Sequence, residues 1–309
     1  MPKWMTNAKP NAPVGRVAAA CVKTRLKRVR KHLPKAASQA DRDIEHIHQL
    51  RVWTRRAAAA LRLFKPLLPK RRAKWMRSQL KSIRRAAGDA RDLDVLLQRL
   101  EQWSDPPGDL APLIYEVQQR RSAAQPAVVE VYDQMRQDDL LKHRCRELVA
   151  RVRTGGEEAG EVTRFGPWAD EQLRMVLETF YQAASADLSD LEQLHAFRIA
   201  GKRLRYTMEL LAGAYPRSFR KSLYRNISNL QEKLGSINDR RVAGARFLAW
   251  AEQCSDAANA QLLKDLAAAE ADQLNTLRQQ FFTWWTPEQS QALQSAFDKM
   301  LSLRNAEPS

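Results

Sequence analysis

The sequence predicts an all-α protein made of two similar helical halves. Apolar residues recur at helical spacing along most of the chain, and no stretch shows the sustained alternation that a strand requires. A helical segment at 43–69 also recurs at 190–216. Periodicity therefore predicts the fold class. The repeat predicts two four-helix-bundle-like halves related by a pseudo-two-fold axis.

The repeat keeps one register over a long stretch. His48 matches His195 at an offset of 147 residues. The same offset pairs Arg51 with Arg198, Arg55 with Lys202, Arg56 with Arg203, Gly88 with Gly235, Asp92 with Asp239 and Trp103 with Trp250. Chance matches would not hold one register across so many helical turns, so we predict internal duplication.

Apolar spacing and turn residues set the expected elements in chain order. Helices are expected at 14–33, 43–65, 70–103, 110–137, 139–153, 168–184, 190–213, 217–250, 256–285 and 288–303. Pro34 is expected to end the first helix, since proline lacks the backbone N–H that a helix interior needs. Gly88 is expected to interrupt the third, because glycine weakens a helix.

Composition divides the chain into domains. Residues 1–13 are polar with three prolines and are expected to form a disordered or loosely docked arm. The glycine-rich stretch 154–167 is the expected linker between a first bundle at 14–153 and a second at 168–305.

Positive charge is concentrated at one end of the chain. The net charge is +17 over 309 residues, yet residues 1–103 alone hold 26 Lys and Arg against 7 Asp and Glu. The rest of the chain is close to neutral. This asymmetry favours a polyanionic partner.

The cysteines and the hydropathy pattern indicate the compartment. Cys21, Cys145 and Cys254 are an odd number without metal-ligand spacing, which suits a reducing cytoplasm. The N-terminal stretch has no apolar core of a signal peptide, and no later stretch is long enough to span a bilayer. A cytoplasmic protein without membrane contact is expected.

The repeated segment carries a row of cations. With about 100° per helical residue, His48, Arg51, Arg55 and Arg62 share one face, apart from an apolar stripe. The second copy repeats the pattern with His195, Arg198, Lys202 and Arg205. Like charges at these spacings repel, so the rows indicate a bound anion. Supporting contacts are expected from Lys23, Lys27, Arg30 and Arg84.

Four segments carry a family resemblance. HQLRVWTRRAAAALRLF with AAGDARDLDVLL, and HAFRIAGKRLRY with LQEKLGSINDRRVA, resemble the CHAD family, the conserved-histidine α-helical domain. The resemblance implies two helical bundles and a basic central furrow that binds inorganic polyphosphate, and it suggests association with polyphosphate granules. By position it assigns to the furrow His48, Arg51, Arg55, Arg56, His195, Arg198, Lys202, Arg203 and Arg205.

The two copies differ at two positions. Glu209 occupies the place of Arg62, and Asn238 the place of Arg91. The second row is therefore expected to contribute less, or Glu209 to orient its neighbours.

Other readings of these residues stay open. Each histidine could brace the fold through a carboxylate such as Asp92 or Asp239. A metal site is disfavoured because His46 and His48 lie about 200° apart on a helix. The acids do not cluster as a metal-dependent hydrolase needs, so no enzyme activity and no cofactor are expected. The alternative function is nucleic-acid binding through the same charge, although few aromatic residues accompany the rows.

Overall fold

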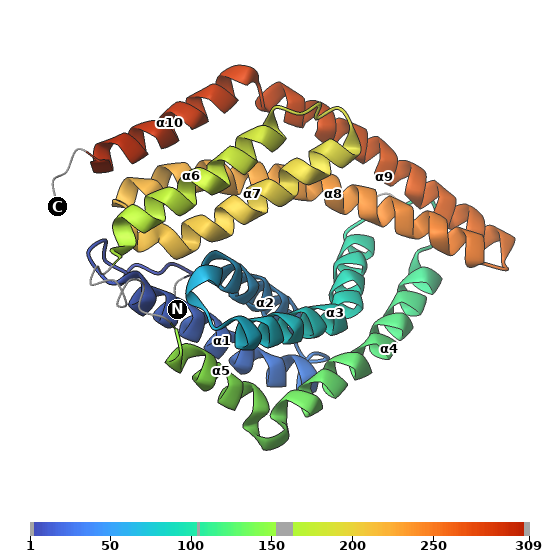
Figure 1. Ribbon diagram of the computed structural model, residues 1–309. Helices are drawn as coiled ribbons and strands as arrows, with labels where there is room; N and C mark the ends of the chain where they lie inside the picture. The colour runs from blue at the N-terminus through green and yellow to red at the C-terminus, as the bar shows by residue number, and fades with distance from the viewer. Residues whose placement is uncertain (1–2, 104–105, 153–162, 306–309) are drawn as a thin grey trace. The chain divides into compact units, whose positions relative to one another are not determined.

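The protein is all-α over the residues that the computed structural model describes, namely 3–103, 106–152 and 163–305 (Figure 1). The elements before residue 153 are α1 (Val14–Ser38), α2 (Glu45–Leu63), α3 (Lys70–Glu101), α4 (Ala111–Arg136) and α5 (Leu140–Ala150), with short 3-10 turns at Lys65–Leu67 and Gln137–Asp139. Those after residue 162 are α6 (Phe165–Ala184), α7 (Leu191–Leu211), α8 (Tyr224–Gln253), α9 (Ala257–Trp284) and α10 (Pro287–Asn305), with a 3-10 turn at Ala212–Ala214 and a π-helical turn at Phe219–Leu223.

The chain forms two compact units. The N-terminal unit contains the described residues of 5–103 and 109–168, and the C-terminal unit contains 169–305 together with residues 3–4 and 106–108. In the N-terminal unit α2 packs between α1 and α3, while α4 packs on α3 and α5 on α1. In the C-terminal unit α8 packs against both α7 and α9. Most of the predicted linker, residues 154–162, lies outside the described residues.

Helix positions recur between the two units. α5 and α10 begin 147 residues apart, at Leu140 and Pro287. α4 and α9 begin within one residue of the same offset, at Ala111 and Ala257. Since the order and the spacing of the helices both repeat, this correspondence is what internal duplication of the sequence would produce.

Each motif helix buries its predicted apolar stripe. On α2, Leu50, Ala57 and Leu61 have 1% exposure or less. On α7, Phe197 and Leu204 are fully buried. Burying one such large side chain contributes about 1.5–3 kcal/mol, so packing of the stripe, and not helix propensity, holds these cation-rich helices in place.

Pro34 does not end α1. The helix continues to Ser38, whose hydroxyl donates to the carbonyl oxygen of Pro34 at 2.9 Å. Proline removes one intrahelical hydrogen bond, but Leu33, Ala36 and Ala37 around it are buried. Tertiary packing therefore outweighs the local preference that predicted the helix end.

Gly88 likewise lies inside a continuous helix, so the predicted interruption of α3 was wrong. A Cβ atom at this position would lie 3.3 Å from Nη1 of Arg51. The absence of a side chain at Gly88 gives Arg51 room to approach the α3 backbone.

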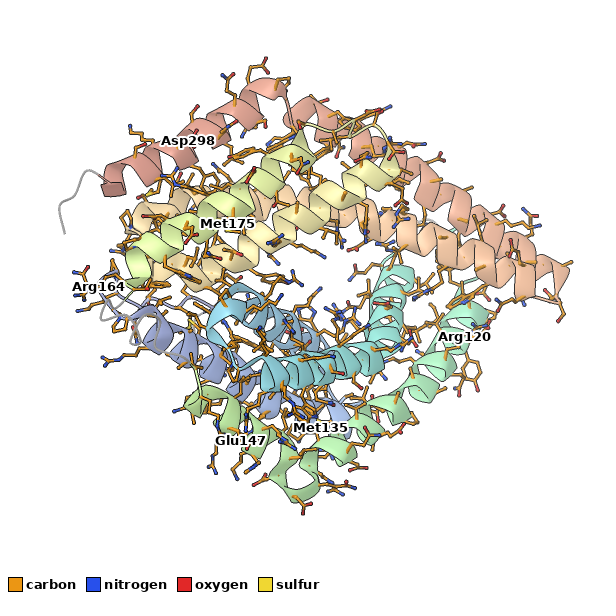
Figure 2. The ribbon with its side chains drawn as sticks, in the orientation of Figure 1. Arg120, Met135, Glu147, Arg164, Met175 and Asp298 are labelled. Carbon is orange, nitrogen blue, oxygen red and sulfur yellow. The ribbon has the colours of Figure 1, made fainter. Side chains whose placement is uncertain are left out.

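The described part of the predicted N-terminal arm is docked on the start of α6. The amides of Phe165 and Gly166 donate to the carbonyl oxygens of Ala12 at 2.9 Å and Pro10 at 2.8 Å. Arg164, labelled in Figure 2, donates to the backbone of Asn11 at 2.7 Å. The first amides of a helix have no intrahelical partner, so the arm supplies acceptors that α6 needs.

Among the described residues, no helix combines the length and the apolar composition needed to cross a bilayer.

Candidate anion-binding site

Three of the predicted cations on α2 lie on the face that turns toward α3. His48, Arg51 and Arg55 share this face because their spacings of three and four residues keep side chains on one side of a helix. All three are partly exposed, whereas Leu50 and Ala57 on the opposite stripe are buried. The sequence therefore placed this part of the row correctly relative to the core.

Arg51 crosses from α2 to α3. Its Nη1 donates to the backbone oxygens of Ala87 at 3.2 Å and Arg84 at 3.5 Å, and its Nη2 donates to Oδ1 of Asp92 at 3.5 Å. Only 20% of its side chain is exposed. Arg51 thus braces α2 against α3 through Asp92 and the α3 backbone. Whether His48 also braces the fold stays a prediction.

Two further arginines come from α3. The charges of Arg84 and Arg91 act on Arg51, and that of Arg91 also acts on His48. We call the resulting group the α2–α3 cation cluster: His48, Arg51, Arg55, Arg84 and Arg91. Within the described part of the chain Arg55, Arg84 and Arg91 form no ion pair, and Nε of Arg55 is buried without a hydrogen-bond partner.

The cluster disfavours positive charge on its own histidine. Burial lowers the pKa of His48, and the charges of Arg91, Arg55 and Arg51 lower it further, while Glu45 opposes the shift. Burial also lowers the pKa of the Arg51 guanidinium, although Asp92 opposes this. A bound anion would relieve the repulsion that these shifts report.

The second copy has a neutral counterpart to part of this cluster. Asn238 of α8 stands where α3 has Arg91, and its Oδ1 lies 3.2 Å from Nδ1 of His195. Its amide nitrogen donates to Oδ1 of Asp239 at 3.4 Å. Asn238 thus connects His195 to the carboxylate of Asp239. His48, by contrast, is near the guanidinium of Arg91.

The position of Arg84 is also neutral in the second copy. Gln231 occupies it and is only 6% exposed, and a Cβ atom on Gly201 would lie 2.2 Å from its Nε2. The end of the Gln231 side chain therefore lies directly against Gly201, and α7 and α8 pack closely there.

The remaining cations of the second copy stay at the surface of α7 to different degrees. Arg198 and Lys202 are partly exposed and Arg203 is exposed. The guanidinium of Arg205 lies 5.1 Å from the ring centroid of Tyr206, which is 9% exposed. Tyr206 is thus a packing residue that carries a cation on its ring.

Four predicted contacts lie away from the cluster. The guanidinium of Arg56 lies 4.9 Å from the ring centroid of Trp53, because Arg56 is turned about 80° from His48 around α2. Arg30 faces α5, where its charge acts on Cys145. Lys23 and Lys27 of α1 are exposed, and neither is among the main charges that act on His48 or Arg51.

Arg62 and Glu209 occupy corresponding positions of the two copies but lie in different environments. Arg62 is exposed in the last turn of α2. Glu209 is 1% exposed and accepts a hydrogen bond from the hydroxyl of Tyr224 at 2.9 Å. Its carboxylate therefore belongs to the core of the C-terminal unit. The expectation that it orients its neighbours stays a prediction.

The family model of the CHAD domain matches residues 20–248, which include both motif helices, all of α3 and most of α8. The chain belongs to the CHAD family. Comparison with curated proteins gives no match.

Two solved structures show the same fold as this CHAD domain. One is the CHAD domain from the plant Ricinus communis, with 23% identity, a TM-score of 0.71, and coverage of 88% of this chain and 93% of the other. The other is PptA from Streptomyces chartreusis, with 17% identity, a TM-score of 0.65, and coverage of 87% of this chain and 98% of the other.

Sequence reasoning noted Arg91 only as the counterpart of Asn238 and did not place it in the site. Its spacing of seven residues from Arg84 puts both on one face of α3, which was the signal that could have found it. Only the packing of α2 on α3 shows that this face meets His48. The predicted furrow shared by the two halves of the CHAD domain stays a prediction.

Proposed function

We propose that the protein binds inorganic polyphosphate, with the α2–α3 cation cluster as the principal contact. The observation that carries the proposal is the concentration of five cationic or ionisable side chains from two helices. Their charges act on one another, and the carboxylates of Asp92 and Glu45 are too few to neutralise them. The expectation attached to the CHAD family supports the same ligand.

Polyphosphate fits the chemistry of these side chains. It offers closely spaced anionic oxygens and no bases, so it must be recognised through charge and geometry. Arginine can donate two parallel hydrogen bonds to phosphate oxygens. Three arginines of the cluster form no ion pair with a described residue: Arg55, Arg84 and Arg91.

The surroundings of the cluster favour polyphosphate over a nucleic acid. Single strands are commonly held by bases that stack on exposed aromatic rings. The aromatic rings beside the two rows are covered, since Trp53 is 6% exposed and Tyr206 is 9% exposed. A nucleic acid would therefore gain only its phosphate contacts here.

Competition tests the proposed ligand. Labelled long-chain polyphosphate should bind at low salt and weaken steeply as salt is raised, because binding releases counterions. DNA and RNA of matched total charge should displace it poorly. Equal displacement by either nucleic acid would contradict the proposal and favour the nucleic-acid alternative.

We further propose that binding occurs without turnover. The carboxylates nearest the cluster serve arginines of the fold, since Asp92 pairs with Arg51 and Asp94 with Arg121. Incubation with long chains and Mg²⁺ should leave the chain length unchanged on a gel, and shortened products would contradict this. A tagged protein should colocalise with polyphosphate granules in cells that form them.

A further inference from the structure

A second group of cations surrounds Trp53, between α1 and α2. The guanidinium of Arg56 lies 4.9 Å from the indole ring centroid, and those of Arg25 and Arg28 each lie 5.5 Å from it. The imidazole of His32 stacks parallel to the same indole, with 6.4 Å between ring centroids. We call this group the Trp53 cation cluster: Arg25, Arg28, His32 and Arg56.

This group lies on a different side of α2 from the α2–α3 cation cluster. Trp53 and Arg56 are rotated about 140° and 80° from His48, in the direction away from Arg51. Trp53 contacts arginines of α1, whereas the charge from a neighbouring helix that acts on His48 is that of Arg91 on α3. One helix thus carries cations toward two different neighbours.

His32 lies among positive charges. Burial lowers its pKa, and the charges of Lys31, Arg28, Lys35 and His46 lower it further. No carboxylate opposes the shift. Its Nδ1 is buried and has no hydrogen-bond partner.

Covering the indole explains only part of the group. Arg25 is 1% exposed and seals one part of the ring. Arg28 and Arg56 remain partly exposed, and Arg28 forms no ion pair with any described residue. A cation on an indole contributes about 0.5–1 kcal/mol at an exposed site. A single cation over the indole would already give this stabilisation. Further cations on the same helix face repel one another.

The fold itself does not require the group. At the corresponding positions of the second copy stand Gln172, Met175, Thr179, Ala200 and Arg203. Met175, which replaces Arg28, is 53% exposed on α6 and is labelled in Figure 2. The corresponding helices α6 and α7 therefore pack without the aromatic ring and with one of the four cations, so this helix pairing does not by itself require the group.

We propose that the Trp53 cation cluster is a second phosphate-binding surface, with Arg28, Arg56 and His32 as its donors. Arg25 is too deeply buried to reach a ligand and positions the indole beneath the other two guanidiniums. The ligand is an inorganic phosphate chain, and the proposal rests on the proposed function only for that choice. A long chain can occupy both clusters at once, whereas a short one fills them separately.

Tripolyphosphate and NMR provide the test. The indole N–H resonance of Trp53, assigned with Trp53→Phe, and the ring resonances of His32 should shift on titration. The pKa of His32 should rise in the complex, because a bound anion favours the imidazolium. Arg28→Gln with Arg56→Gln should abolish these shifts and weaken long-chain binding at least tenfold.

A matched control removes the same charge elsewhere in the N-terminal unit. Arg120→Gln with Arg136→Gln takes one partly exposed and one exposed arginine from α4, of which Arg120 is labelled in Figure 2. It should leave the Trp53 shifts intact and change binding less than threefold. Melting temperatures of both variants show that they are folded.

The outcomes separate this proposal from the proposed function. Tripolyphosphate that shifts His48 but leaves Trp53 and His32 unchanged would overturn the second surface alone. Equal loss of affinity in both double variants would show that only the net charge matters. That result would also overturn the second surface. Binding at neither histidine would overturn both proposals.

Discussion

The two arginines that α3 adds to the cation cluster can be exchanged for the residues of the second copy. Arg84→Gln with Arg91→Asn installs the residue types of Gln231 and Asn238. Arg84 is exposed and Arg91 partly exposed, and neither forms an ion pair with a described residue. The variant should therefore fold, with a free energy of unfolding within about 0.5 kcal/mol of the parent.

The expected loss of affinity follows from the contacts removed. A hydrogen bond to a charged group contributes about 1.5 kcal/mol at the low end, so two cost about 3 kcal/mol. That corresponds to roughly 100-fold weaker binding of long-chain polyphosphate. Each phosphate contact on a single-stranded polyanion adds about 0.7 to the slope of log K against log salt, so the slope should fall by about 1.4.

Fluorescence anisotropy with labelled polyphosphate at four salt concentrations measures both quantities. The double variant Arg120→Gln with Arg136→Gln serves again as the control, because it removes equal charge away from the cluster. If the Arg84 and Arg91 variant binds like this control while melting normally, the cluster is not the contact. A lower affinity with an unchanged salt slope would also refute the electrostatic reasoning.

The exchange can be made in the opposite direction at one position. Asn238→Arg places a cation beside His195, as Arg91 stands beside His48. If the second copy contacts the ligand, one added contact of about 1.5 kcal/mol gives roughly tenfold tighter binding. No change in affinity would show that the second row lies outside the contact.

Three further predictions concern stability and pH. Arg51→Ala should lower the free energy of unfolding by about 1–3 kcal/mol in a denaturant melt, because it leaves the carbonyl and carboxylate acceptors on α3 without their donor; an unchanged melt would mean that Arg51 serves the ligand alone. The pKa of His48 is lowered on folding, so the unfolded chain binds the proton first: stability should be full above about pH 6.5 and fall as pH drops from there toward the folded pKa. His48→Gln should make the free energy of unfolding less dependent on pH in this range. Added polyphosphate should reduce the loss of stability of the parent at low pH. An unchanged pH dependence in His48→Gln would contradict this prediction. Gly235→Ala should raise the free energy of unfolding by up to about 1 kcal/mol, since a Cβ atom there meets nothing within 4 Å and alanine is the better helix former. A destabilised variant would show that the position has no room for a side chain.

The local spacing of apolar residues was sufficient to predict the helices and the buried face of each motif helix. The apolar stripe of α2 is a matter of residues three and four apart, so Leu50, Ala57 and Leu61 could be assigned to the core without knowing the partner. The same spacing put His48, Arg51 and Arg55 on one exposed face. Pro34 shows the limit of local rules, because buried neighbours kept α1 helical beyond it.

The roles of individual cations could not be read from one helix. Arg51 and Arg56 both lie in the first-copy motif, yet Arg51 donates to the backbone of α3 and Arg56 lies over an indole facing α1. The difference depends on which helix packs on which side of α2. That choice is made by contacts between residues far apart in the chain.

The sequence by itself predicted an all-α chain with two copies of one motif helix, each carrying a row of cations, because helical periodicity and repeats can be read from the order of residues alone. Only the tertiary structure decided that Arg91 joins His48, that Trp53 collects a second group, and that Gln231 lies directly against Gly201. These facts depend on how closely two helices approach and which faces they share. Side-chain packing between distant segments sets both.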